Sequence, residues 1–179
     1  YGQRARLREE AAARALCRRW EVPLHHVALP WLAALARTSG SRLLPGAGAL
    51  PASTPEAPGD AASASAVWIP ARNAVFVAIA AAHAEARGAD VVVAGFNREE
   101  AATFPDNSAE FVAAAARLLA FGTRTAVTVA SPTIAWDKQR IVAEARGLGL
   151  TAADVWSCYE GGEQPCGRCE SCVRSRWQR

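Results

Sequence analysis

Four cysteines near the C-terminal end of the sequence have the types and spacing of a metal site. Cys158, Cys166, Cys169 and Cys172 follow the pattern C-x7-C-x2-C-x2-C within CYEGGEQPCGRCESC. A C-x2-C pair curls around one ion, and zinc takes about four soft ligands in a tetrahedron. Gly167 suits the tight turn of such a pair, because glycine tolerates positive φ. Four cysteine ligands leave no open coordination position, so we expect one structural Zn²⁺ per chain and no catalytic metal.

Two other states of these cysteines remain open on the sequence alone. Disulfide pairs are disfavoured because the spacing is metal-like and no basic start followed by an apolar run indicates a signal peptide. An iron–sulfur cluster is the main competitor to zinc. The same lack of a secretory signal leads us to expect a cytoplasmic protein.

The composition limits the class of protein. The chain has 179 residues, of which 51% are apolar. The apolar fraction excludes a disordered chain, and the length suits one domain with a hydrophobic core. No apolar run reaches 18 residues, so we expect no membrane span. The net charge of +3 is too small to indicate nucleic-acid binding by itself. There is no methionine, and we therefore expect the sequence to be a fragment or to lack its natural N-terminus.

The elements that must position any site alternate between helix and strand. We expect a flexible surface loop over 38–66, because Gly, Ala, Ser and Pro dominate there. The alternation favours an α/β domain with a mostly parallel sheet over 1–155, followed by a zinc-binding tail over 156–179. The expected helices are 4–20, 71–87, 107–121 (with capping-box spacing at Asn107 and Glu110) and 138–146, and the expected strands are 24–29, 90–95, 125–130 and 155–156.

Polar residues beyond the carboxyl ends of parallel strands are candidates for ligand binding. Asn97 and Asp106 follow the apolar strand that ends near Gly95. Lys138, the only lysine, begins the helix after the strand that ends near Ala130. A positive charge is unfavourable at a helix N-terminus, which suggests a compensating anion such as a phosphate. The alternative is a surface lysine that extends into solvent.

Arg72 and Asn73 lie where a loop enters a helix. A guanidinium at this point could hold a phosphate or carboxylate through two parallel hydrogen bonds. The alternative is an arginine on a solvated turn beside a residue that caps the helix, and the residues alone favour that alternative.

Several motifs together resemble one enzyme family. Residues 156–172 (WSCYEGGEQPCGRCESC) resemble the zinc tail of the 7-cyano-7-deazaguanine synthase family. Residues 1–4 (YGQR) resemble the family's segment after its second strand, and 69–73 (IPARN) resemble its Pro-x-Arg-Asn motif. Residues 95–97 (GFN) and 104–106 (FPD) resemble its Gly-x-Asn and aromatic-Pro-Asp loop. The resemblance covers most of the chain except the 38–66 loop.

The resemblance implies a fold and a reaction. The fold would be an adenine-nucleotide alpha-hydrolase-like, Rossmann-like α/β sheet. The reaction would convert 7-carboxy-7-deazaguanine and ammonia to 7-cyano-7-deazaguanine (preQ0), with ATP and Mg²⁺, for queuosine or archaeosine in tRNA. A homodimer would be expected, with neither a membrane nor direct nucleic acid as partner. The resemblance also favours a role in substrate or nucleotide binding for Arg72, Asn73, Asn97, Asp106 and Lys138. It assigns no catalytic residue.

The sequence departs from the family pattern in two places. The family's phosphate loop, Ser-Gly-Gly-x-Asp-Ser, lies upstream of its Tyr-Gly-Gln segment and is not in this sequence, so we expect the chain as given not to turn over ATP. Residues 104–108 (FPDNS) stand where many bacterial members have Tyr-Pro-Asp-Cys-Arg. Two alternatives therefore stay open: a related enzyme that modifies another acceptor, such as a tRNA base or a protein terminus, and a non-catalytic zinc-stabilised binding module.

Overall fold

A computed structural model of the chain describes residues 1–54, 61–175 and 177. The chain divides into two compact units, which we call the central unit (Ala71–Ile141) and the terminal unit (Tyr1–Pro70 with Val142–Arg179). The division at residue 155 that we expected from the sequence stays a prediction. Both units combine helices with extended segments, and each is described by itself.

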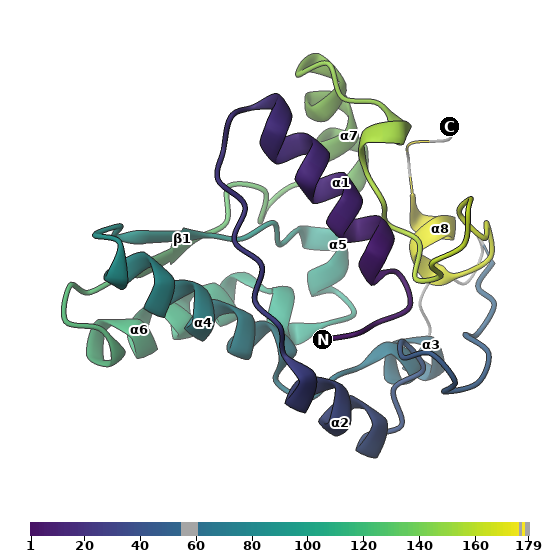
Figure 1. The fold of residues 1–179 in the computed structure, drawn as a ribbon, viewed down its shortest axis with the longest axis horizontal. Helices are drawn as coiled ribbons and strands as arrows, with labels where there is room; N and C mark the ends of the chain where they lie inside the picture. The colour runs from purple at the N-terminus through teal and green to yellow at the C-terminus, as the bar shows by residue number, and fades with distance from the viewer. Residues whose placement is uncertain (55–60, 176, 178–179) are drawn as a thin grey trace. The chain divides into compact units, whose positions relative to one another are not determined.

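The elements follow one another in the order shown by the colours of Figure 1. The terminal unit contains α1 (Arg6–Arg19), α2 (Pro30–Thr38), α3 (Ala61–Val67), the 3₁₀ helix η2 (Ala152–Asp154) and α8 (Glu170–Arg174). The central unit contains α4 (Arg72–Ala86), β1 (Val91–Val93), α5 (Arg98–Ala101), the 3₁₀ helix η1 (Pro105–Asn107), α6 (Ala109–Gly122) and β2 (Thr128–Ala130). Helix α7 (Lys138–Gly147) begins in the central unit, and its residues from Val142 belong to the terminal unit.

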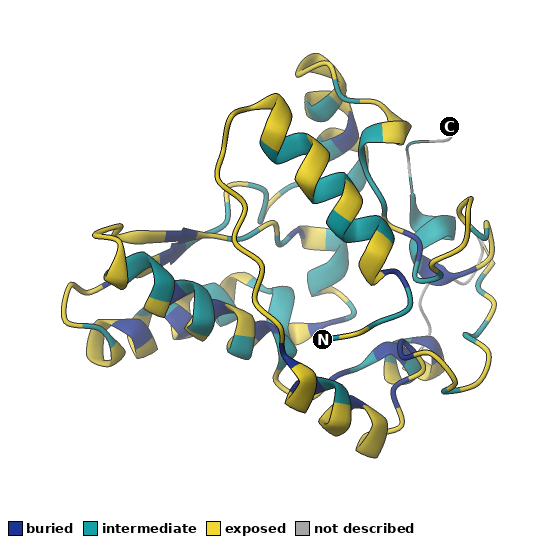
Figure 2. Ribbon diagram, viewed as in Figure 1, coloured by how far each residue is buried: buried dark blue, intermediate teal, exposed yellow. Residues whose placement is uncertain are grey.

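A parallel pair of strands forms the sheet of the central unit. β1 pairs with β2 in the register Val91 to Thr128 and Val93 to Ala130. Parallel strands need a crossover connection, and α6 lies within the connection between them. Helices α4 and α6 pack against the strands. Figure 2 shows the buried residues along these elements; they are Val77, Ala81, Val92, Ala115, Leu119, Val127 and Val129. The α/β architecture with a parallel sheet is thus as the sequence predicts.

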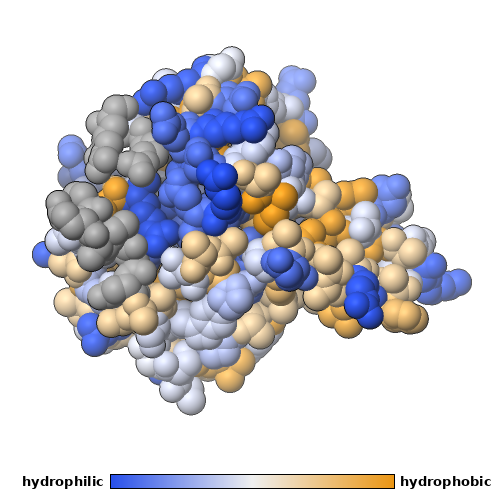
Figure 3. Space-filling view, turned by 180° about the vertical axis from the view of Figure 1, so that it is seen from behind, coloured by the Kyte–Doolittle hydropathy of each residue, from blue (hydrophilic) through white to orange (hydrophobic). Residues whose placement is uncertain are grey.

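The strand predicted over 90–95 is shorter and less buried than its apolar sequence suggested. Only Val92 is buried, whereas Val91 is 40% and Val93 is 68% exposed. Successive side chains of a strand point to opposite faces, and the core of α4 and α6 contacts the face that carries Val92. Figure 3 shows orange apolar side chains at the surface of this unit, toward the right of the view. Other exposed apolar side chains in the central unit are Phe76, Leu118 and Phe121.

Two predicted strands, 24–29 and 155–156, are wrong. Among the described residues neither segment pairs with a strand, and both run as irregular chain. A strand needs a hydrogen-bonded neighbour, and β1 and β2 pair only with each other within the described residues. Leu24 and Val27 are 38% and 39% exposed, and only Leu29 of this segment is buried, so its apolar residues do not form a continuous buried face.

Part of the segment that we predicted as a flexible loop, 38–66, is helical or buried in the structure. Pro30, which directly follows the strand predicted over 24–29, occupies the first turn of α2, where its missing N–H costs nothing. Ser41, Leu43 and Leu44 are buried, and the amide of Arg42 donates to the carbonyl of Ala66 at 2.7 Å. Residues 55–60 of the predicted loop lie outside the described residues.

The four predicted helices are all present. Gly88 has a φ of 71°, as expected of the residue that ends α4. The cap of α6 differs from the prediction: Ser108, not Asn107, accepts the amide hydrogen of Phe111 through its Oγ at 3.1 Å. Within the described residues no single helix has the length and apolar character needed to span a membrane, although α3 and α4 pass that test as a pair bent by 43°.

Candidate functional site

The four cysteines come together in the terminal unit as the spacing predicts. Their sulfur atoms all lie within 4.8 Å of one another. The Sγ atoms of Cys166 and Cys172 are 4.0 Å apart, as are those of Cys158 and Cys169. A tetrahedral zinc with Zn–S bonds of about 2.3 Å separates its sulfurs by about 3.8 Å. All four thiols are free, so the geometry suits a metal ion and no disulfide links them.

Backbone amides point at the sulfurs. The amides of Glu160 and Cys166 both donate to Cys158 Sγ at 3.3 Å, and the amide of Cys169 donates to Cys166 Sγ at 3.3 Å. Such bonds stabilise the thiolate form that a metal binds. Gly167 has a φ of 72°, which confirms the tight turn expected after Cys166.

The thiol pKa values separate into two groups. Burial raises the pKa of Cys169 to about 11, and burial also raises the pKa of Cys172. Burial acts in the same direction on Cys166, but hydrogen bonds from the amides of Arg168 and Cys169 outweigh it and lower its pKa. A thiol with a raised pKa stays protonated at neutral pH, so a metal that enters the cluster must displace protons from Cys169 and Cys172.

Trp156 holds the start of the segment that carries the four cysteines. Its Nε1–H group lies 2.9 Å from the carbonyl oxygen of Cys158 and 3.2 Å from that of Glu160. On the other side of the loop, the amide of Ser53 donates to the carbonyl of Arg168 at 2.9 Å. The segment 155–156, which we predicted as a strand, thus holds the start of the chain that carries the four cysteines.

The loops after β1 and β2 meet beyond the carboxyl ends of the strands, where the sequence places the polar candidates. The hydroxyls of Ser131 and Thr133 both donate to the carbonyl of Phe96, at 3.1 Å and 2.7 Å. The amide of Arg98 donates to the carbonyl of Trp136 at 3.0 Å. Ser131 and Thr133 are not among the predicted site residues, although their position directly after a predicted strand was an available signal.

Asn73 and Asp106 are brought together. Asn73 is buried near the start of α4, and its Nδ2 donates to the backbone carbonyl of Asp106 at 3.2 Å. The Asp106 carboxylate accepts from Asn107 Nδ2 at 3.1 Å. Ala71, directly before Arg72, has a φ of 55°, a left-handed conformation that costs energy in a residue other than glycine. Neither Arg72 nor Asn73 caps α4, since the residue at that position is Ala71.

Asn97 and Lys138 are both linked to the short helix α5. Asn97 is buried, and its Oδ1 accepts the amide hydrogen of Glu100 at 3.1 Å. Lys138 Nζ lies 2.5 Å from a carboxylate oxygen of Glu100, and the Lys138 amide donates to Glu99 Oε1 at 2.9 Å. Glu100 therefore supplies a negative charge beside Lys138 from within the protein, and the bound phosphate that the sequence suggested stays a prediction. Glu100 thus forms an ion pair and Glu99 accepts a backbone hydrogen bond, and both contacts join two loops that are far apart in the sequence.

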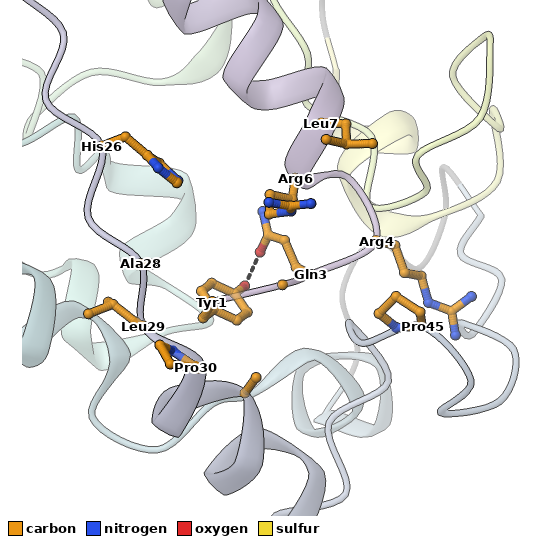
Figure 4. A pocket seen from close by; sticks show the side chains of 12 residues that line it. Tyr1, Gln3, Arg4, Arg6, Leu7, His26, Ala28, Leu29, Pro30 and Pro45 are labelled. Carbon is orange, nitrogen blue, oxygen red and sulfur yellow. Dashed lines mark hydrogen bonds between the residues drawn. The ribbon is translucent and has the colours of Figure 1, made fainter.

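The terminal unit also contains an open pocket of about 490 Å³. Figure 4 shows Tyr1 and Gln3 pointing toward one another in it, with a hydrogen bond between the Tyr1 hydroxyl and Gln3. His26 and Leu29 line the other side. Most of this lining is apolar, and Arg4 and Arg6 add positive charges.

The comparisons with known proteins agree with one another. The family model described as "Queuosine biosynthesis protein QueC" matches residues 1–177. A 7-cyano-7-deazaguanine synthase of Pelotomaculum thermopropionicum is 45% identical over 178 residues, covering 97% of this chain and 79% of that relative. Synthases of the same name from Bdellovibrio bacteriovorus and Methanosarcina barkeri are 40% and 41% identical, each covering 77% of the relative.

Proposed function

We propose, on the premise that this chain belongs to the queuosine biosynthesis protein QueC family, that it is part of a 7-cyano-7-deazaguanine synthase. The observation that carries the proposal is the identity of 45% over 97% of the chain with a protein of that name. The proposal extends to the adenine-nucleotide alpha-hydrolase fold, to ATP with Mg²⁺ as co-substrate and to zinc as the metal of the four cysteines.

The proposed reaction overcomes the low reactivity of a carboxylate. The carboxylate of 7-carboxy-7-deazaguanine attacks the α-phosphorus of ATP, which gives an acyl adenylate and releases pyrophosphate. Ammonia then attacks the acyl carbon, AMP leaves with the carboxyl oxygen, and a primary amide forms. A second ATP activates the amide oxygen in the same way, and loss of AMP and the amide protons leaves the nitrile. Cleavage of the phosphoanhydride drives each step.

The five candidate residues of the central unit would bind substrate or nucleotide. Asn73 and Asp106 are joined by a hydrogen bond, and the Asp106 carboxylate is half-buried, which suits recognition of the ring edge or exocyclic amine of a guanine-like base. Arg72 would supply a guanidinium for a phosphate or carboxylate. Asn97 and Lys138 are held by α5, so they are placed to shape the loop around the ligand. The role of each stays a prediction.

The experiment that tests the proposal is mass spectrometry of the products from 7-carboxy-7-deazaguanine, ammonia and ATP. Two preparations are compared: the 179-residue chain, and the same chain preceded by any further residues that its coding sequence encodes. We expect the nitrile only from a preparation that contains a Ser-Gly-Gly-x-Asp-Ser loop. Its product would be lighter than the acid by the difference between a carboxyl and a nitrile group. A folded, metal-loaded preparation that carries the loop yet consumes no ATP would favour the binding-module alternative.

A related enzyme with another acceptor, such as a tRNA base or a protein terminus, is the second candidate. The observation that favours it is the sequence of the loop 104–108, in which Asn107 and Ser108 stand where many family members have Cys-Arg. ATP consumption without formation of the free nitrile would support this candidate.

Three further expectations belong to the proposal. The family resemblance leads us to expect a homodimer, which sedimentation of the purified protein tests directly. The cytoplasmic location stays a prediction. The substrates are small molecules, a deazapurine and ammonia, and we expect no direct contact with nucleic acid or membrane.

A further inference from the structure

We propose that the metal at the four cysteines positions the first eight residues of the chain, and with them one wall of the pocket in the terminal unit. We call residues 1–8 the N-terminal segment and 158–166 the cysteine loop. The inference rests on the proposed metal site but not on the proposed reaction. Two arginines and one glycine carry the connection.

Arg4 ties the N-terminal segment to two loops at once. Its Nη1 lies 3.2 Å from the carboxylate of Glu160, within the cysteine loop. Its Nε donates to the carbonyl of Arg42 at 3.0 Å, and Nη2 donates to the carbonyl of Gly48. The Arg4 amide donates to the carbonyl of Leu43 at 2.9 Å. With its side chain only 17% exposed, this arginine joins three distant parts of the sequence in one network.

Gly161 lies against the backbone of the N-terminal segment. A Cβ atom built on Gly161 would lie 2.2 Å from the carbonyl oxygen of Arg4 and 3.1 Å from its carbonyl carbon. Backbone atoms cannot move aside as the end of a flexible side chain can, so only glycine fits here. The neighbouring Gly162 differs: its Cβ would meet only the carbonyl oxygen of Gln164, at an ordinary 3.5 Å. Neither glycine has a left-handed φ, so the two positions differ in the space available for a side chain and not in backbone strain.

Arg8 makes the second connection from the N-terminal segment to the cysteine loop. Its Nε donates to the carbonyl of Gly162 at 2.8 Å. Its guanidinium carbon lies 5.4 Å from the centre of the Trp156 ring, the ring that anchors Cys158. Glu160, Gly161 and Gly162 therefore all contact the N-terminal segment.

The metal controls these contacts because of where the three residues lie. They fall between Cys158 and Cys166, in a stretch that has no helix or strand. Both ends of this stretch are cysteines of the cluster, and a shared ion fixes the two ends together. Loss of the ion frees the loop and withdraws the partners of Arg4 and Arg8.

These contacts also determine the position of residues that line the pocket. Tyr1, Gln3 and Arg6 line it from the N-terminal segment, opposite His26 and Leu29 (Figure 4). In Figure 4 the Arg4 side chain extends toward the side of Pro45, away from the Tyr1 ring. Most of the N-terminal segment lines the pocket, Arg4 included, so metal occupancy sets the position of this wall through the contacts of Arg4 and Arg8.

The test compares the wild type with and without metal, and Gly161→Ala with Gly162→Ala at saturating metal, in the 179-residue chain. Removal of the metal from the wild type should speed exchange in the N-terminal segment, and unchanged exchange would overturn the inference. Hydrogen–deuterium exchange is followed in peptides from the N-terminal segment, where the amide of Arg4 is the main reporter. Metal content by mass spectrometry, and the absorption spectrum of the cobalt-loaded protein, show whether the four-sulfur site is intact. Exchange at Val92 and Leu119 reports on the folding of the central unit.

We expect both variants to bind one ion with an unchanged cobalt spectrum. In Gly161→Ala, exchange at Arg4 should be about tenfold faster, the factor that loss of one hydrogen bond to a charged group represents. Gly162→Ala should behave as the wild type does, and Arg4→Ala should reproduce the effect of Gly161→Ala. Unchanged exchange in the N-terminal segment of a metal-loaded Gly161→Ala protein would overturn the inference. A wild-type chain that binds no metal would instead contradict the proposed metal site.

Discussion

At the scale of single residues, the chemistry of the protein depends on which side chains already have partners. The four cysteines lie at metal-binding distances from one another. Lys138, by contrast, is already paired with Glu100 in the structure. A nucleotide phosphate that binds Lys138 must compete with that carboxylate or bind beside it.

The first prediction concerns Cys158, the most buried of the four clustered cysteines at 1% exposure. Cys158→Ser should reduce bound zinc from one ion per chain to a small fraction, because a hydroxyl is a poor substitute for a soft thiolate. The measurement is native mass spectrometry. Cys17→Ser is the matched control, since Cys17 is a free thiol of α1 and is not part of the cluster. Equal zinc content in the two variants would contradict the assignment of Cys158.

The second prediction concerns the Lys138–Glu100 pair, whose side chains are 18% and 23% exposed. A double-mutant cycle with Lys138→Met and Glu100→Gln should give a coupling of about 0.5–1 kcal/mol in urea unfolding. The exposed pair of Arg14 and Glu10 on α1 should couple more weakly. A coupling of zero would mean that Lys138 is available to a ligand without competition.

At the scale of elements, the caps determine where helices begin and how loops are held. Ser108 caps α6, and Thr151 with Asp154 forms a capping box at η2. These caps are adjacent to the two candidate sites, the 104–108 loop and the cysteine loop. A substitution that removes only a capping hydrogen bond should therefore lower the free energy of unfolding and leave the neighbouring candidate binding residues unchanged.

The third prediction tests the cap of α6. Ser108→Ala should lower the free energy of unfolding by about 1 kcal/mol, because the amide of Phe111 loses its acceptor. Asn107→Ala, at the position that the sequence first suggested, should cost less, since its side chain bonds only to Asp106 among the contacts described. Urea denaturation measures both. A larger loss for Asn107→Ala would reverse the assignment.

The fourth prediction concerns pH. Hydrogen bonds from Thr151, first of all from its side chain, lower the pKa of Asp154 below its usual value. A carboxyl with a lowered pKa in the folded state contributes stability that is present above about pH 4 and is lost as the pH falls through its folded pKa. The difference in urea midpoint between the wild type and Asp154→Asn should therefore shrink as the pH falls below about 4. A difference that stays constant down to pH 2 would show that the charge of Asp154 is irrelevant.

The sequence predicted those features that depend on local spacing. The cysteine cluster follows from C-x2-C spacing, and the helices follow from apolar periodicity and stop signals such as Gly88. The strand at 24–29 could not be judged in this way, because a strand exists only when a neighbour supplies hydrogen bonds. Pro30 is equally compatible with the end of a strand and the first turn of a helix, and only tertiary packing decides between them. The ion pair of Lys138 with Glu100 likewise depends on two loops that meet in space.

At the scale of the whole molecule, the chain contains two units with different sources of stability. The central unit has an apolar core of two strands and two helices. The terminal unit combines a buried set around Leu32, Leu44 and Ile69 with the cysteine cluster. Metal binding should therefore stabilise the terminal unit in particular.

The fifth prediction follows from that difference. An ion that binds only the folded chain should stabilise it by about 4 kcal/mol at a free concentration a thousandfold above Kd. The midpoint of urea unfolding should therefore rise with zinc concentration in the wild type. It should not respond in Cys158→Ser, which is the control. A zinc-independent midpoint in the wild type would mean that the cluster forms no folded-state metal site.

The network around Arg4 also has a consequence for the order of events during synthesis. Arg4 and Glu160 are 156 positions apart in the sequence, so their contact cannot form until the ribosome has made nearly all of the described chain. The central unit, by contrast, is encoded by one continuous stretch and can complete its core earlier. Residues 1–8 are thus among the last parts of this sequence to be fixed, and the nascent chain must keep them from misassociating until the cysteines emerge.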